Sequence, residues 1–371
     1  MIDNALSPIV ARFDFPGEWV DCEEIVTGHI NSTFALTFAL PGGGERRYVL
    51  QRINTIAFKQ PRLVMENVLG VTEHLRKALI ARGEDPSTRV LRVIPMRTGE
   101  AMLMENGDCW RAYDYITHAV SVDRVDGPEE FFEIGRAFGE FQRMLADYPI
   151  EKLHDTIPCF HDTKRRLENF EASVEKDVAH RAAEVGEEIA FVRKRKAEMG
   201  RIVEMIADGT LPLRVTHNDT KINNVMLDAD TKKALCVIDL DTVMAGSALY
   251  DFGDAIRFGA STAAEDERDL SKVSLDLDLF RSFADGFISQ TADGLTEAEL
   301  VNLPLGALVM TFEVGLRFLT DYLDGDVYFR IESPDHNLAR CRTQFKLLSD
   351  MEAKRGEMDA IVRALIEKHK R

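Results

Sequence analysis

The segment from residue 216 to 241 holds the side chains whose types and spacing most clearly imply chemistry. His217 is followed by Asp219 two positions later, and Asn224 comes five positions after that. In a phosphotransfer loop with this spacing, the Asp receives the proton of the attacking hydroxyl and the Asn binds Mg²⁺. The spacing therefore predicts a catalytic loop in which Asp219 accepts the proton and His217 shapes the loop through hydrogen bonds.

The residues after this loop predict where a metal ion would bind. Two short apolar runs, 225–227 and 235–238, flank a polar turn and indicate an antiparallel hairpin. In that hairpin residue 224 lies opposite residue 239, so Asn224 and Asp239 meet at its open end beside Asp219. Amide and carboxylate oxygens suit Mg²⁺ that is shared with phosphate groups. The expected metal ligands are therefore Asn224 and Asp239.

A second acidic motif competes for the metal role. Asp251-Phe252-Gly253 has the letters of the motif that binds metal in protein kinases. It falls twelve residues beyond Asp239, so the hairpin does not position its carboxylate. We expect Asp251 to cap a helix through 255–258 and to brace the catalytic loop.

The strand-rich first third of the chain supplies the expected nucleotide contacts. The segment 28–32 can cover phosphate groups with its backbone amides, although with one glycine it fits a plain turn equally well. The strand expected at 47–53 contains no Lys, so Arg52 is the expected phosphate-binding cation, with Glu66 or Glu73 as its partner. The expected set is Gly28, Asn31, Ser32, Arg52, Glu66, Asp114 and Ile116.

The surrounding elements indicate an α+β protein in two parts. β-branched and aromatic residues predict strands at 24–27, 33–40, 47–53, 90–95 and 101–105. Apolar spacing predicts helices over 61–82 and 131–147 and a long helical run along 165–207. We expect a small lobe (1–117) with an antiparallel sheet and one main helix, and a large, mostly helical lobe (118–371). A cleft between two such lobes is a natural ligand site.

The composition is that of an acidic globular protein. Among 371 residues, 46 Lys and Arg against 63 Asp and Glu give a net charge of −17, which disfavours nucleic-acid and anionic-membrane partners. Five scattered cysteines indicate neither a disulfide framework nor a zinc site. The longest mostly apolar run, 303–312, is about half of the ~20 residues that a membrane span needs. We expect a cytoplasmic monomer or homodimer that binds small-molecule substrates.

These motifs resemble the aminoglycoside phosphotransferase and choline kinase-like superfamily, which is related to protein kinases. The signature is His217-x-Asp219-x4-Asn224 followed by Ile238-Asp239. Within the superfamily the N-acetylhexosamine 1-kinases look most similar, on the residues 49–54, 217–224, 237–244, 250–254 and 317–323 with 328–329.

The resemblance implies a bilobal protein kinase-like fold and transfer of the γ-phosphoryl group of ATP, with Mg²⁺, to the anomeric C1 hydroxyl of an N-acetylhexosamine. It makes Asp219 the catalytic Asp, and Asn224 and Asp239 the metal ligands. The chain departs from the superfamily in the third strand, where Gln51 stands at about the place of the usual Lys. The identity of the phosphate-binding cation is thereby left open.

The helical part offers polar and aromatic side chains that can hold the acceptor. Besides Asp219, the candidates are His161, Arg165, Asp254, Arg317, Asp321 and Tyr328. Each serves equally well in an internal contact, and Arg317 and Asp321, four residues apart on one expected helix, can pair with each other. Two alternatives stay open: a kinase of another hydroxyl compound (another sugar, homoserine, choline or an aminoglycoside) and a non-catalytic nucleotide-binding module.

Overall fold

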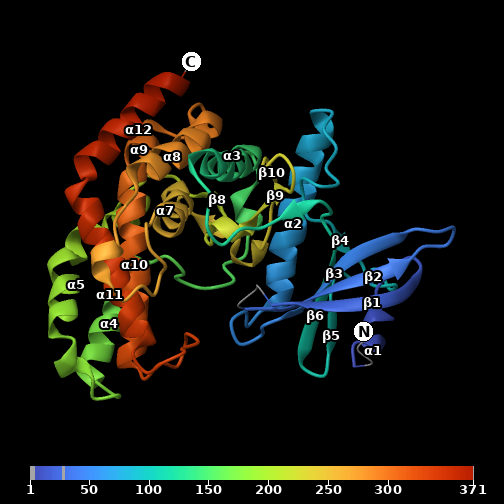
Figure 1. Ribbon diagram of the computed structural model, residues 1–371, viewed down its shortest axis with the longest axis horizontal. Coiled ribbons are helices and arrows are strands. Elements are labelled where there is room, and N and C mark those ends of the chain that lie inside the picture. The colour runs from blue at the N-terminus through green and yellow to red at the C-terminus, as the bar shows by residue number, and fades with distance from the viewer. Residues whose placement is uncertain (1–4, 27–29, 371) are drawn as a thin grey trace.

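An antiparallel sheet forms the first part of the chain, and helices form most of the rest (Figure 1). The structure is a computed structural model that describes residues 5–26 and 30–370. Its main sheet has the order β1–β2–β3–β6–β4, with β5 paired to β6. The strands are β1 (Glu18–Ile25), β2 (Ser32–Ala39), β3 (Glu45–Ile53), β4 (Val93–Ile94), β5 (Leu103–Glu105) and β6 (Asp108–Asp114).

The two faces of this sheet pack against different elements. Successive side chains along a strand point to opposite faces, so Leu50 of β3 lies on one face and Val49 lies on the other. The face with Leu50 packs against the N-terminal segment that includes α1 (Ser7–Val10). The face with Val49 packs against α2 (Pro61–Ala81), which lies between the sheet and the helical part in Figure 1. Side chains on this second, inner face are the ones that can reach the catalytic loop.

Helices bury the core of the second part. The helices α3 and α8 pack side by side, and α10 contacts α4, α7 and α11. The α-helices are α3 (Pro128–Met144), α4 (Thr163–Lys176), α5 (Gly186–Met199), α6 (Arg201–Ala207), α7 (Ala248–Gly259), α8 (Leu277–Thr291), α9 (Glu297–Val301), α10 (Leu303–Leu323), α11 (His336–Ala353) and α12 (Arg355–His369). Short 3-10 turns are η1 (Ile150–Lys152), η2 (Ala182–Glu184), η3 (Ile222–Asn224), η4 (Leu240–Thr242) and η5 (Leu270–Lys272).

Two small sheets lie where the two parts meet (Figure 1). In one, β9 (Val225–Asp228) pairs with both β10 (Ala234–Val237) and β7 (Ala119–Val120). In the other, β8 (Arg214–Thr216) pairs with β11 (Met244–Gly246). The catalytic motif runs from β8 to β9, so these sheets hold both of its ends.

The α+β organisation expected from the sequence is confirmed, with an N-terminal antiparallel sheet and a mostly helical remainder. The helical run expected along 165–207 was wrong, because it is divided into α4, α5 and α6. Asp177 ends α4 in a left-handed conformation (φ 41°). Its carboxylate then accepts the N–H groups of Arg181 and Ala182, which stabilises the break.

The helix α10 is longer than the apolar run expected there. It continues past Phe312 to Leu323 and, by length and composition alone, could cross a membrane. However, 89% of its most apolar stretch is buried inside the protein. A central core helix has this character, because its neighbours cover it on nearly every side.

The helices α7 and α10 approach each other through glycines. A Cβ added at Gly253 of α7 would lie 2.2 Å from the carbonyl oxygen of Gly306 of α10. One added at Gly306 would lie 2.3 Å from the carbonyl oxygen of Leu249. No side chain fits at these distances, so the two backbones are in direct contact. This contact fixes the side chains of α7 relative to those of α10.

We expect Gly306→Ala to destabilise the protein by about 1–3 kcal/mol, because the new methyl group would push α7 away from α10. Gly356→Ala in α12 is the matched control: a Cβ there meets nothing within 4 Å, and Ala favours a helix over Gly by about 1 kcal/mol. Urea unfolding followed by circular dichroism measures both variants. Equal losses in the two would contradict the role of the close helix contact.

Candidate active site

The β9–β10 hairpin positions the residues on both sides of it. At its open end the Ile238 N–H donates to the Asn224 carbonyl at 2.9 Å. The expected register, with residue 224 opposite residue 239, was wrong by one. The turn itself closes where the Asp228 N–H donates to the Lys233 carbonyl at 2.8 Å, and the register shifts between Ala234 and Cys236. Asp239 therefore lies just beyond the last pair, in a left-handed conformation (φ 59°).

Asp219, Asn224 and Asp239 gather at this open end. Asn224 Nδ2 donates to the Asp219 carbonyl at 2.7 Å and to Asp219 Oδ2 at 3.3 Å. The Asn224 amide oxygen and the Asp239 carboxylate make no hydrogen bond to any described residue. Asp239 is open on one side, but protein surrounds it elsewhere. This desolvation, with the negative charges of Asp241 and Asp219, raises its pKa to about 6.

The His217 ring joins the catalytic loop to the hairpin. Its Nε2 lies 2.8 Å from the Ile238 carbonyl, and its Nδ1 accepts the Asp219 N–H at 3.3 Å. Because a carbonyl oxygen can only accept, Nε2 carries the proton and Nδ1 is bare. The buried ring is therefore neutral, and the edges of Phe138 and Phe141 pack around it. With both nitrogens engaged, His217 holds the loop and is not available to a substrate proton.

The Asp251 carboxylate holds the backbone of the same loop. It accepts the N–H groups of His217 at 2.9 Å and Asn218 at 2.7 Å, and the side chain of Gln142 at 2.7 Å. Burial raises its pKa, and these donors limit the rise. Asp251 does not cap a helix as expected, because Ser247 takes the N-cap position of α7.

His161 fixes the loop from another side. Its Nε2 lies 3.0 Å from the Asn218 carbonyl, and its Nδ1 lies 2.8 Å from Glu313 Oε1. The second oxygen of Glu313 accepts the Thr163 hydroxyl at 2.7 Å. Burial opposes the ionisation of Glu313, but His161 and the other donors hold its pKa below the usual value. Both His161 nitrogens are engaged in protein contacts.

An ion pair between Arg111 of β6 and Asp241 of η4 joins the sheet to the hairpin end. Arg111 Nη1 and Nη2 donate to the two Asp241 oxygens, Nη2 at 2.9 Å. The side chains are only 1% and 2% exposed. Asn31 also donates to Asp241 at 2.8 Å, and Gln51 accepts from Arg111 Nε at 3.0 Å. Burial alone would lower the pKa of Arg111, but the Asp241 charge raises it.

Arg52 lies on the opposite face of the sheet. Its guanidinium is 5.9 Å from the Trp110 ring centre, on the outer side. The expected pairing with Glu66 or Glu73 was wrong, since Glu66 pairs with His154 at 2.7 Å and Glu73 pairs with Lys77 at 3.3 Å. Strand alternation is the reason, because it turns Gln51 inward and Arg52 outward.

Arg111 and Asp241 were not among the residues expected from the sequence. A signal for both was present. Arg111 is a charged residue inside the otherwise apolar run 109–113, and Asp241 follows Asp239 by two positions. A charge in a buried strand requires a partner of opposite sign.

A further cation, Lys221, lies within the catalytic loop. Its Nζ is 3.6 Å from Asp219 Oδ2, and the Asp219 charge raises its pKa. An ammonium group here can donate to phosphate oxygens brought to Asp219. Lys221 belongs to the motif, but its spacing from the other residues did not identify it as a phosphate-binding cation.

The other nucleotide-side candidates lie along β2 and β6. Ser32 begins β2 and accepts the Arg52 side chain at 3.4 Å. Asp114 ends β6, and its carboxylate pairs with two arginines. Ile116 is buried in the connection to β7. Gly28 lies outside the described residues.

Two of the acceptor candidates are engaged by the fold. Asp254 pairs with Arg257 at 2.8 Å; burial opposes its ionisation, but Arg257 lowers its pKa. Asp321 accepts the N–H groups of residues 327–329 at 2.7–3.0 Å. It therefore shapes the loop after α10, and no ion pair with Arg317 forms in the described part of the chain.

Arg317 lies among three aromatic rings. Its guanidinium carbon is 5.5–5.8 Å from the ring centres of Phe160, Tyr328 and Phe329. Tyr328 is 68% exposed, so this group opens to solvent. The structure thus brings the expected residues Arg317 and Tyr328 together.

Arg165, by contrast, points away from this group. It is exposed and pairs with Glu168 at 2.8 Å. Its neighbour Arg166 faces inward, and its Nη2 donates to the Phe160 carbonyl at 2.8 Å. The buried Phe170, four residues further along α4, marks the inward face. Helical spacing from Phe170 would have indicated Arg166.

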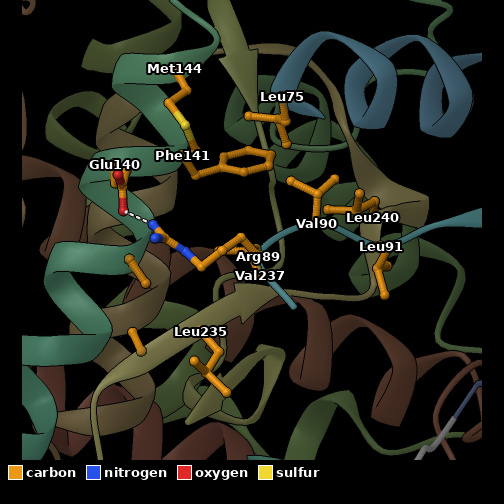
Figure 2. A pocket seen from close by; sticks show the side chains of 12 residues that line it. Leu75, Arg89, Val90, Leu91, Glu140, Phe141, Met144, Leu235, Val237 and Leu240 are labelled. Atoms are coloured by element: carbon orange, nitrogen blue, oxygen red, sulfur yellow. Dashed lines mark hydrogen bonds and ion pairs between the residues drawn. The ribbon is translucent and has the colours of Figure 1, made fainter. Parts of the chain in front are cut away.

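A small cavity and a larger groove lie outside the catalytic loop. The small cavity, of about 30 Å³, lies between α2, α3 and β10. Figure 2 shows the side chains that line it, among them Arg89 and Glu140, which pair at 2.8 Å. It has room for only one or two water molecules. A groove of about 880 Å³ runs along α2 and reaches Asp114 and Tyr115. Neither hollow is lined by the catalytic loop.

The buried Glu313 predicts a pH-dependent contribution to stability. Its folded-state pKa is lowered from 4.5, so its contribution is complete above that value and is lost as the pH falls below it. We expect Glu313→Gln to cost about 3–5 kcal/mol at pH 7 because a partner of a buried pair is removed. The difference from the wild type should narrow between pH 5 and pH 3 in urea unfolding. A difference that is independent of pH would contradict an ionised Glu313.

A family model described as the phosphotransferase enzyme family (APH) matches residues 21–278. The microcompartment-associated aminopropanol kinase is 16% identical with a TM-score of 0.62, over 96% of this chain and 99% of that chain. The amicoumacin kinase hAmiN, solved with AMP-PNP and Ca²⁺, is 14% identical with a TM-score of 0.61, over 95% and 94%. Choline kinase from Cryptosporidium parvum is 14% identical with a TM-score of 0.55, over 93% of each chain.

The solved structures establish the fold, since their sequence identities are low. They confirm the kinase-like α+β architecture with its N-terminal sheet and helical C-terminal part. The family match covers more than half of the chain and includes the main sheet, the catalytic loop and the β9–β10 hairpin. The chain therefore belongs to the APH phosphotransferase enzyme family.

Proposed function

We propose that this small-molecule phosphotransferase transfers the γ-phosphoryl group of ATP to the anomeric C1 hydroxyl of an N-acetylhexosamine. The observation that carries the proposal is the grouping of Asp219, Asn224 and Asp239. The Asn224 amide oxygen and the Asp239 carboxylate accept no hydrogen bond from any described residue. The sugar acceptor is supported by the motif resemblance described above. It is also supported by Arg317 and Tyr328, because aromatic faces and planar donors suit a sugar ring.

Asp219 would orient the acceptor hydroxyl and accept its proton as the new O–P bond forms. Phosphoryl transfer has a loose transition state, so positioning and charge neutralisation matter more than the strength of the base. The anomeric hydroxyl is also more acidic than an ordinary alcohol. Lys221, beside Asp219, would donate to the oxygens of the phosphoryl group in transfer. His217 keeps Asp219 in place through its backbone amide.

The donors at the hairpin end fit Mg²⁺. Asn224 would contribute an amide oxygen and Asp239 a carboxylate, both of which are hard ligands. Within 5–26 and 30–370, no group of three His, Cys, Asp or Glu side chains could hold a metal ion, so these two residues would supply only part of a coordination shell. Mg²⁺ bound there would neutralise phosphate charge. The complex of the similar hAmiN with AMP-PNP and Ca²⁺ supports the use of a nucleotide and a divalent cation.

The two parts of the chain would bind different substrates. Residues 1–117 would bind the nucleotide, with Asn31 and Ser32 at the start of β2 and with Asp114 and Ile116 at the connection between the parts. Residues 118–371 would carry the catalytic loop and bind the acceptor. Arg111 would then be the cation that ties the nucleotide-binding sheet to the metal-binding end of the hairpin, through Asp241.

The main alternative is phosphorylation of another small hydroxyl compound. The names of similar structures, an aminopropanol kinase and a choline kinase, favour it. An ADP-release assay with Mg-ATP and a panel of N-acetylglucosamine, N-acetylgalactosamine, glucose, homoserine, choline and kanamycin decides between them. Turnover of the N-acetylhexosamines to C1-phosphorylated products supports the proposal. Turnover confined to another compound overturns the acceptor and retains the phosphotransfer.

We expect Asp219→Asn to lower kcat by about 10²- to 10⁴-fold, because an amide cannot accept the hydroxyl proton. Asp230→Asn, in the exposed β9–β10 turn, is the matched control and should keep wild-type activity. ADP release with a saturating acceptor measures both variants. Near-normal turnover by Asp219→Asn would remove Asp219 from the mechanism.

We expect Asp239→Asn to raise the Mg²⁺ concentration needed for half-maximal activity by at least about 10-fold, since a neutral amide is a weaker ligand than a carboxylate. A titration of Mg²⁺ at fixed ATP measures this shift. The same Asp230→Asn control should show no shift. An unchanged Mg²⁺ requirement would place the metal ion elsewhere.

A further inference from the structure

Arg166 and Arg317 form a pair of cations without a carboxylate partner. Both contact Phe160: Arg166 Nη2 donates to its carbonyl at 2.8 Å, and the Arg317 guanidinium lies 5.7 Å from its ring centre. Among the described residues, neither guanidinium has an ion-pair contact with a carboxylate. The Nε of Arg166 is buried and has no hydrogen-bond partner in that same part of the chain.

The carboxylate that influences Arg166 is already occupied. Glu313 acts on Arg166 through its charge, but its oxygens accept from His161 and Thr163. Burial lowers the pKa of Arg166, and the positive charge of Arg317 lowers it further. The pair is therefore a local excess of positive charge in a chain whose net charge is −17.

The two arginines that are fully buried in the described part of the chain are neutralised. Arg111 pairs with Asp241, and Arg257 pairs with Asp254. A partly buried arginine without a carboxylate loses solvation and gains no ion pair, which costs free energy. Arg166 and Arg317 have no such partner among the described residues, and an anion from outside the chain would supply one.

The surroundings leave donors free for such an anion. Rings of Phe160, Tyr328 and Phe329 lie near Arg317, and rings do not accept the in-plane N–H groups of a guanidinium as a carboxylate does. Tyr328 is largely exposed, so a ligand can enter from solvent. Planar guanidinium groups match the geometry of a carboxylate through two parallel hydrogen bonds.

The pair also lies beside the catalytic loop. Phe160 precedes His161, and His161 Nε2 reaches the carbonyl of Asn218 at 3.0 Å. Asn218 is the neighbour of Asp219 in the chain. One compact segment thus connects the two arginines to the residue that would receive the acceptor hydroxyl.

We propose that Arg166 and Arg317 bind a carboxylate of the acceptor, so that the substrate is a hydroxyl compound that also carries an acid group. This inference rests on the proposed phosphotransfer at Asp219 and names the class of its acceptor. Among N-acetylhexosamines it favours one with an acidic substituent. An acceptor whose only charged group is an ammonium would be repelled by the two guanidinium groups.

Two matched pairs of compounds test the inference by calorimetric titration of the full chain with Mg²⁺ and AMP-PNP. N-acetylmuramic acid is N-acetylglucosamine with an added carboxylate-bearing group, and homoserine is 3-amino-1-propanol with an added carboxylate. In at least one pair, we expect the acid to bind about 10- to 100-fold more tightly than its partner. The inference is overturned if neither acid binds, or if neither binds more tightly than its partner.

ADP release with the same four compounds keeps this test separate from that of the proposed function. Turnover of homoserine alone would overturn the sugar acceptor and support the carboxylate. Turnover of N-acetylglucosamine with a kcat/KM at least equal to that of N-acetylmuramic acid would support the sugar and overturn the carboxylate.

Variants assign the effect to the arginines. Arg317→Gln should remove the advantage of the preferred acid, so that the acid and its uncarboxylated partner bind with similar affinity. Arg166→Lys, which keeps the charge, should retain part of the advantage. Arg193→Gln is the control, because this exposed arginine pairs with Glu171. Equal weakening of both members of a pair by Arg317→Gln would indicate a structural role and overturn the inference.

Discussion

The position of Asp219 depends on hydrogen bonds to a stretch of backbone that has no regular secondary structure of its own. Buried backbone groups need partners, and between residues 216 and 219 these come from side chains distant in sequence. Asp251 of α7 accepts two N–H groups, His161 reaches the Asn218 carbonyl, and the Thr242 hydroxyl donates to the His217 carbonyl at 2.7 Å. The helices must therefore be placed correctly before the loop can be, and the backbone contact of α7 with α10 secures part of that placement.

Charged residues near the site fall into two groups. Those engaged within the protein, such as Arg111 with Asp241 and His161 with Glu313, hold elements together. Those without such a partner, such as Asp239 and Arg317, are available to molecules from outside. The first group is also more deeply buried than the second. The presence or absence of an opposite charge within hydrogen-bond reach separates them.

The local part of this arrangement could be predicted from the sequence. Asn224 and Asp239 flank one hairpin, so their proximity follows from the chain between them, even with the register wrong by one residue. The side of the sheet to which Arg52 points could not be predicted in this way, because it depends on which face of the sheet packs against α2. The pairing of Arg111 with Gln51 also depends on β3 lying next to β6. No pattern within either strand reveals that neighbour.

The buried link from Arg111 of β6 to Asp241 of η4 limits how far the sheet can move away from the hairpin end. A hinge motion that carried the whole sheet away from η4 would break this buried ion pair and its hydrogen bonds, which costs free energy. Motions that keep β6 in place avoid this cost. Bending of β1, which lies at the far edge of the sheet from β6, is such a motion. The sheet is thus tied to Asp241 through Arg111 of β6 and through Asn31 at the start of β2.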